Sequence, residues 1–179
     1  MNVREEPKRV LALDLRPRSF GYVVFEGPDR LLDWGVRSFR RGVNAVRIPR
    51  AKKLATLLEE SMPSAVVLQK SWSHAKNNQK RSKALDAALR VAKKTGTAVR
   101  LVGSHAVIKA FGSQGHLTKY QVASAVAERF PELAVRLPPQ RKPWQSEDYR
   151  MSIFDAAALG VAFFAKKAEG ESSISPPPS

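Results

Sequence analysis

One carboxylate in this chain, that of Asp14, lies at the end of a predicted buried strand, where it could bind a metal ion. Asp14 follows the apolar residues 10–13 and precedes a turn and a second apolar segment, residues 20–25. The pattern predicts a buried strand that ends in an acid, with a second strand running back beside it. A buried charge is costly unless a metal or a hydrogen-bond partner compensates it. Asp14 is therefore either a carboxylate that holds Mg²⁺ at the edge of a sheet or an acid that initiates the turn.

The elements that must position this acid alternate along the chain. Apolar or mixed segments predict strands over 9–14, 20–25, 31–39, 65–69 and 97–102. Helical spacing predicts helices over 45–61, through Leu85 to a stop at Gly96, over 119–130 and over about 147–167. This order predicts an α/β fold with a mixed five-stranded sheet flanked by helices. We expect a single domain over 1–168 and a disordered, Ser- and Pro-rich tail over 169–179.

The charge of the chain indicates a polyanionic partner. The 179 residues include 31 Lys plus Arg and 16 Asp plus Glu, which gives a net charge of +15. Nucleic acid is the partner that such a surplus favours, and a basic surface that serves only solubility is the alternative. The chain has no cysteine, and no apolar run approaches the ~18–20 residues that span a bilayer. The first residues lack the apolar stretch of a signal peptide, so we expect a cytoplasmic protein without membrane contact.

The ordered set of motifs resembles a known family. It comprises the strand that ends in Asp14, the Gly21-Tyr22 pair on the second strand, the short strand that ends in Gln69, and the final helix with Phe154-Asp155. Together they resemble the RuvC family of Holliday-junction resolvases, within the ribonuclease H-like fold. The resemblance runs from about residue 10 to 164, and the segments 76–78 and 112–119 support it.

This resemblance implies metal-dependent cleavage of phosphodiester bonds in DNA. Two Mg²⁺ or Mn²⁺ ions about 4 Å apart would activate a water and stabilise the departing oxygen. Asp14 and Asp155 match the first and last acids of the family and are the expected metal ligands. The chain departs from the family at two positions, because Gln69 and Ser152 stand where the family has acids. Gln69 could still offer an amide oxygen, but it brings no charge.

Two further acids could replace the missing ones. Glu147 and Asp148 precede Asp155, and Asp148 would share a helix face with it, about 10 Å away along the axis. That distance argues against one shared metal. Acids in the first turn of a helix also suit its dipole, and we favour that structural interpretation of both residues. Asp148 nevertheless remains a catalytic candidate.

Basic and aromatic residues near these acids suit the binding of nucleic acid. Trp72, shortly after Gln69, is placed to stack on bases opened at a junction, or else to serve as a core or lid residue. In the turn after Asp14, Arg16 and Arg18 flank Pro17, where they could bind phosphate or displace a metal. The other expected phosphate contacts are Lys70, Lys76, Lys80, Arg81 and Lys119. A solvated helix face, or for Lys119 an ordinary surface lysine, is the alternative.

Three functions follow from these features. The first is a structure-selective endonuclease that resolves branched DNA as a homodimer, with Mg²⁺ or Mn²⁺ at Asp14 and Asp155. The second is a catalytically degenerate DNA- or RNA-binding module or subunit on the same fold, which Gln69 and Ser152 favour. The third is an RNA-directed member of the fold, since duplex DNA and RNA attract the same charges.

Overall fold

The fold is built on one five-stranded mixed sheet. A computed structural model describes residues 8–39, 49–70, 78–112 and 116–172. The strand order is β3-β2-β1-β4-β5; β1, β2 and β3 are antiparallel neighbours, while β4 and β5 continue the sheet in parallel from β1. The strands are β1 (Arg9–Leu15), β2 (Ser19–Glu26), β3 (Leu31–Ser38), β4 (Ala65–Gln69) and β5 (Ala98–Val102). The predicted α/β class and mixed sheet are confirmed.

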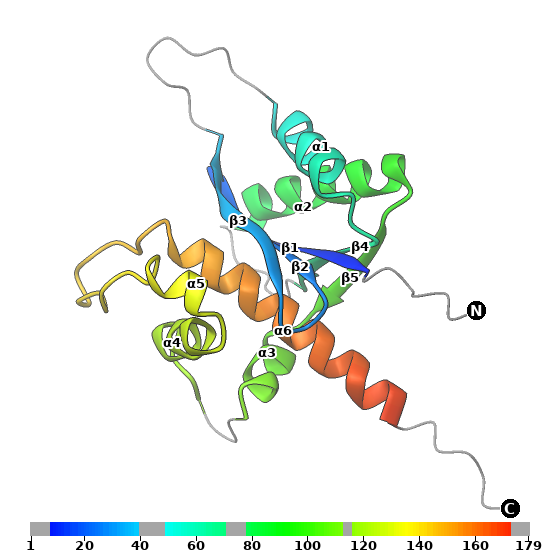
Figure 1. The fold of residues 1–179 in the computed structure, drawn as a ribbon. Helices are drawn as coiled ribbons and strands as arrows, with labels where there is room; N and C mark the ends of the chain where they lie inside the picture. Colours follow the sequence, from blue (N-terminus) through cyan, green and yellow to red (C-terminus); the bar gives the residue numbers. More distant parts are fainter. Residues whose placement is uncertain (1–7, 40–48, 71–77, 113–115, 173–179) are drawn as a thin grey trace, which may run out of the picture.

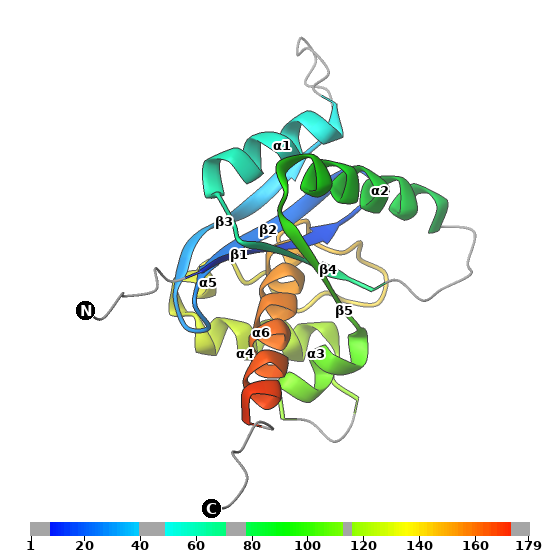
Figure 2. The same ribbon diagram turned by 90° about the vertical axis from the view of Figure 1, so that its right-hand side faces the viewer.

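Helices cover both faces of this sheet (Figure 1). One face carries α1 (Arg50–Ser61) and α2 (Asn78–Thr95), and the other carries α6 (Met151–Ser172). The short α3 (Ser104–Ala110), α4 (Lys119–Arg129) and α5 (Pro131–Ala134) complete the second layer, in which α3 and α4 pack on α6. Figure 2 shows the three layers, with the sheet between α1 and α2 on one side and α3, α4 and α6 on the other. No helix among the described residues is both long and apolar enough to cross a membrane.

The central strand β1 sends alternate side chains into two separate cores. Leu11 and Leu13 pack with residues of α1 and α2, whereas Val10 and Ala12 pack with residues of α6. Because side chains of a strand alternate between faces, Asp14 continues the row of Val10 and Ala12. The acid is therefore directed toward α6 rather than toward solvent.

The helix α6 lies unusually close to the sheet. A Cβ atom at residue 21 of β2 would overlap the backbone carbonyl of Ser152, and one at residue 160 would overlap the ring of Phe25. Glycine at both positions removes that obstacle. Gly21 is also the register partner of Asp14, so this close approach brings the start of α6 to the buried acid.

Some boundaries differ from the sequence-based predictions. The predicted start of the last helix at Glu147 is wrong, because Asp148 accepts a hydrogen bond from the Arg150 backbone N–H and holds a turn ahead of Met151. The predicted tail boundary at Glu169 is early, since α6 continues to Ser172 and Glu169 pairs with Lys109 of α3 at 3.0 Å. The first helix begins at Arg50, and residues 45–48 of its predicted range lie outside the described residues.

We predict that Gly21→Ala destabilises the protein, because the added methyl group meets the rigid backbone of α6. The free energy of unfolding should fall by about 3 kcal/mol or more, the upper end of the cost of overpacking. Urea denaturation followed by circular dichroism measures it. The matched control is Gly170→Ala in α6. A Cβ there has no neighbour within 4 Å, so stability should be unchanged or slightly higher. Equal stability of the two variants would contradict the close packing described here.

Candidate functional site

The site is centred on the carboxylate of Asp14, which is only 3% exposed. The hydroxyl group of Ser152 donates a hydrogen bond to its Oδ2 at 2.9 Å, and Nε of Arg16 donates to the same oxygen at 2.6 Å. The first contact depends on the close approach of α6 at Gly21. Asp14 therefore has both a hydrogen-bond donor and a countercharge, as a buried carboxylate requires.

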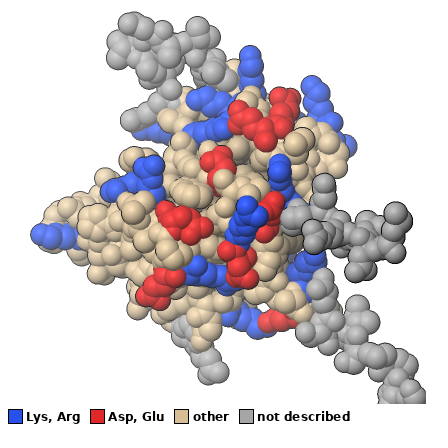
Figure 3. Space-filling view, viewed as in Figure 1, with Lys and Arg blue, Asp and Glu red and all other residues tan. Residues whose placement is uncertain are grey.

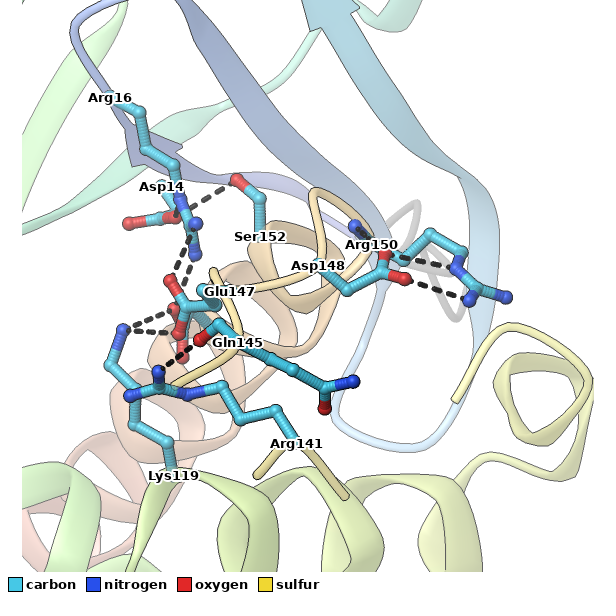
Figure 4. Close-up of polar contacts among 10 residues, drawn as sticks. Asp14, Arg16, Lys119, Arg141, Gln145, Glu147, Asp148, Arg150 and Ser152 are labelled. Atoms are coloured by element: carbon cyan, nitrogen blue, oxygen red, sulfur yellow. Dashed lines mark hydrogen bonds and ion pairs between the residues drawn. The ribbon is translucent and has the colours of Figure 1, made fainter. Parts of the chain in front are cut away.

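Arg16 joins three carboxylates. It lies in the tight turn between β1 and β2, where its backbone N–H donates to the carbonyl of Ser19 at 3.0 Å. From there its guanidinium also contacts Glu147 through Nη1 and Asp155 through Nη2, both at 2.8 Å (Figure 4). A planar fork of donors suits several carboxylates at once.

A second cation completes the cluster. Lys119 is the first residue of α4, whose start is fixed by reciprocal hydrogen bonds between Thr118 and Gln121. Its Nζ lies 3.1 Å from Oε1 of Glu147 and 3.2 Å from Oδ2 of Asp155. Three acids and two bases thus meet where β1, α4 and the start of α6 converge; we call these five residues, Asp14, Arg16, Lys119, Glu147 and Asp155, the ion cluster.

The cluster changes the proton affinities of its members. Burial raises the pKa of Asp155, and the nearby charge of Asp14 raises it further, more than Lys119 and Arg16 lower it. Burial also acts to raise the pKa of Glu147, but hydrogen bonds and charge from Lys119 and Arg16 outweigh it, so this pKa is lowered. The pKa of Arg16 is raised, because the attraction of the carboxylates exceeds the effect of its burial.

A pocket of about 280 Å³ opens beside the cluster. Gln69, at the end of β4, lines this pocket together with Asp14 and Asp155. Its side-chain amide donates to the hydroxyl group of Ser104 at 3.3 Å. The remaining described residues that line it are Ser104, Val107, Ile108, Leu117, Lys119, Val122, Ala158 and Leu159.

The residues as arranged do not fit a pair of Mg²⁺ ions. Magnesium needs hard oxygen ligands with lone pairs directed at the metal. Here nitrogen atoms of Arg16 already lie within hydrogen-bond distance of Asp14, Glu147 and Asp155, which is where a cation shared by the three acids would lie. The hydroxyl group of Ser152 donates a hydrogen bond to Asp14 rather than directing a lone pair at a metal, and the side chain of Gln69 is neutral. Within the described part of the chain, no group of three His, Cys, Asp or Glu side chains is arranged to hold a metal ion.

The structure brings some of the predicted site residues together and separates others. Asp14, Asp155, Arg16 and Lys119 meet in the ion cluster, and Gln69 shares their pocket. Asp148 does not: it pairs with Arg150 at 2.8 Å, and Figure 4 shows that pair apart from the cluster. Its expected place on one helix face with Asp155 is wrong, because residue 148 precedes the helix.

Only some of the residues expected to bind nucleic acid lie within the described part of the chain. Lys70 and Arg18 are exposed, at the end of β4 and in the turn after β1. Trp72 and Lys76 lie outside the described residues, as do the side chains of Lys80 and Arg81 in the first turns of α2. On the face drawn in Figure 3, Lys and Arg side chains lie among acidic ones rather than forming one basic patch.

Comparison with solved structures relates this arrangement to known proteins. Thermus thermophilus RuvC in complex with a Holliday junction substrate superimposes with a TM-score of 0.63 at 22% identity, over 89% of this chain and 96% of that one. The yeast mitochondrial Holliday junction resolvase gives 0.59 at 12% identity, over 93% and 83%. The fowlpox virus resolvase with its Holliday junction DNA gives 0.54 at 13% identity, over 89% and 98%. The chain has the fold of the RuvC-type resolvases. No protein-family model and no curated protein sequence matches it.

The RuvC-type fold accounts for the position of the site. It sets the ends of β1 and β4 next to each other in the sheet and lays the start of α6 across them. Of the four positions at which the resemblance places acids, residues 14, 69 and 155 line the pocket, and residue 152 is buried behind Asp14, to which it donates a hydrogen bond. Residues 14 and 155 are acids, whereas residues 69 and 152 are neutral.

Two members of the site had a different role in the sequence analysis. Glu147 was assigned mainly to a helix dipole, but it lies in the loop before α6 and binds both cations. Ser152 was noted only as a departure from an expected acid, yet it is a buried donor to Asp14. No local signal marked this role of Glu147, because acids at residues 147 and 148 also suit the first turn of a helix.

We predict that Glu147→Gln removes a pH-dependent contribution to stability. The folded-state pKa of Glu147 is below its ordinary value of 4.5, so its contribution is present above that pH and is lost as pH falls through the lowered pKa. The wild type should exceed the variant by about 1 kcal/mol at neutral pH, a value that allows for partial exposure. Urea denaturation at a series of pH values measures the difference.

The control for this prediction is an exposed ion pair elsewhere. Asp29 pairs with Arg129 at 2.9 Å and is largely exposed, so Asp29→Asn should change stability little at any pH. If the difference between wild type and Glu147→Gln stays constant from neutral to acid pH, the role given to Glu147 in the cluster is wrong.

Proposed function

We propose that this protein binds branched DNA through its RuvC-type fold without cleaving it. The observation that carries the proposal is the guanidinium of Arg16, which contacts all three carboxylates of the ion cluster. A chain that supplies its own cation at this position has no need of a metal to balance these acids. It also gives up the metal-bound water on which hydrolysis by such sites depends.

The support for DNA as the ligand comes from fold and charge. Two of the solved structures that share the fold contain Holliday junction DNA. The net charge of +15 suits a polyanion, because each phosphate neutralised by Lys or Arg releases condensed counterions. By analogy with a two-fold symmetric junction, we expect the protein to act as a homodimer.

A second candidate is a metal-dependent, structure-selective endonuclease. The observation in its favour is that Asp14 and Asp155 both line the pocket, with Glu147 close by as a third acid. This activity requires Arg16 to leave the cluster when DNA binds, so that the acids become available to Mg²⁺ or Mn²⁺. The two candidates differ in one measurable result, which is cleavage.

The first test is a labelled four-way DNA junction offered to the wild-type protein with Mg²⁺ and then with Mn²⁺. We expect a gel shift on the junction at concentrations that leave linear duplex unshifted, and no cleavage product with either ion. Asp14→Asn and Asp155→Asn are the controls for any cutting that appears. Symmetric incision that both substitutions abolish would overturn the non-cleaving assignment and establish the endonuclease. Absence of a junction shift would reject both candidates.

The second test asks whether Arg16 excludes the metal. We predict that the double variant Arg16→Ser with Gln69→Glu gains affinity for divalent cations, because three carboxylates then line the pocket with Glu147 beside them, and Lys119 is the one cation of the ion cluster left to oppose them. The readout is the rise in melting temperature when Mn²⁺ is added, which the wild type should not show.

The matched control replaces the neighbouring arginine instead. Arg18→Ser with Gln69→Glu makes the same change in charge, but Arg18 is exposed and stands outside the cluster. If this variant gains as much Mn²⁺ stabilisation as the first, total charge rather than the position of Arg16 decides metal binding.

A further inference from the structure

The loop that leads into α6 contains a turn with many internal hydrogen bonds. The backbone N–H of Gln145 donates to the carbonyl of Lys142 at 2.9 Å, and the backbone N–H of Lys142 donates to Oε1 of Gln145, also at 2.9 Å. Nη1 of Arg141 adds a contact to the carbonyl of Gln145 at 2.7 Å (Figure 4). Residues 141–145, which we call the loop turn, are therefore held in one conformation by their own side chains.

This turn presents a tryptophan to solvent. Trp144 is 78% exposed, although burying an indole is strongly favourable. Nζ of Lys142 lies 5.5 Å from the centroid of its ring, a distance at which a cation and an aromatic face attract each other. An ordered turn that displays a large aromatic ring leaves a flat apolar surface available to a ligand.

The cations of the turn lack local countercharges. Within the part of the chain that the structure describes, neither Arg141 nor Lys142 forms an ion pair with a carboxylate. Arg150, farther along the loop, is instead neutralised by Asp148. An exposed ring beside two uncompensated positive charges has the chemistry of a site for a base and its phosphates.

The turn is also fixed relative to the pocket. Glu147 follows it closely in sequence and accepts hydrogen bonds from Arg16 at 2.8 Å and Lys119 at 3.1 Å. The same loop therefore carries both an acid of the ion cluster and the exposed ring. DNA lying over the pocket edge would be within reach of the loop turn.

We propose that Trp144 stacks on an unpaired base of bound DNA while Arg141 and Lys142 contact the adjacent phosphates. This inference rests on the proposed function and adds to it, because it names an unpaired base as the feature of the DNA that the loop turn recognises. A fully paired duplex offers no free base face, so the loop turn favours single strands and branch points over linear duplex.

The experiment measures the affinity of Trp144→Ala and Trp144→Phe for three DNAs: a thymidine oligomer, a four-way junction and a blunt duplex. Loss of one stacked base should weaken binding of the oligomer and the junction about tenfold and leave duplex binding within about twofold. Trp144→Phe should restore most of the loss, because a phenyl ring still stacks. Val135→Ala is the control, since Val135 is also an exposed apolar residue, 83% accessible, but lies outside the turn.

The outcomes separate this inference from the function on which it rests. A wild type that binds the oligomer tightly but the junction no better than the duplex rejects the proposed function, while the Trp144 variants still report on stacking. Equal weakening for all three DNAs, or equal behaviour of the Ala and Phe variants, overturns the stacking role. Sedimentation of each variant completes the test: dissociation of a dimer by Trp144→Ala with unchanged DNA affinity would assign the ring to a protein contact and overturn the proposal.

Discussion

The arrangement of the site depends on the burial of one carboxylate, that of Asp14. Strand alternation directs this side chain into the core between the sheet and α6, where almost none of it reaches water. A carboxylate in that position must find donors nearby. Ser152 can be one of them only because Gly21 lets the helix backbone approach, and Arg16 is the other because the tight turn folds it back over the strand end. The close packing of α6 on the sheet is therefore also what allows the Asp14 carboxylate to find its hydrogen-bond donor.

The ion cluster joins parts of the chain that are far apart in sequence. Arg16 comes from the first turn, Lys119 from the start of α4 and Glu147 from the loop before α6, and all three share partners. Partly buried pairs of this kind add little net stability, since desolvation offsets most of the attraction. Their directional hydrogen bonds instead fix how these segments lie around the pocket. The chain thus combines the fold of the RuvC-type resolvases with a site in which Arg16 and Lys119 pair with the acids.

The sequence predicted the framework better than the details of the site. Apolar segments located all five strands of the described sheet, and the helix predicted from residue 119 begins there as α4, because these signals are local. The seven-residue α3 is too short to show a period, and the start of α6 was misplaced because a turn at Asp148 looks like a helical first turn in composition. The meeting of Asp14 with Asp155 followed from the family resemblance. That Arg16 would lie among three acids depends on distances between segments, which no local pattern contains.

A cation supplied by the chain behaves differently from one taken from solution. A bound metal ion follows mass action, so its occupancy falls when the free ion becomes scarce or when a stronger ligand competes. Arg16 is tethered by the backbone two residues after Asp14, and its guanidinium does not lose its proton in proteins. It has no dissociation constant and no competitor. The charge balance of the pocket is therefore set when the chain is synthesised, and it stays the same whatever the ionic composition of the surroundings.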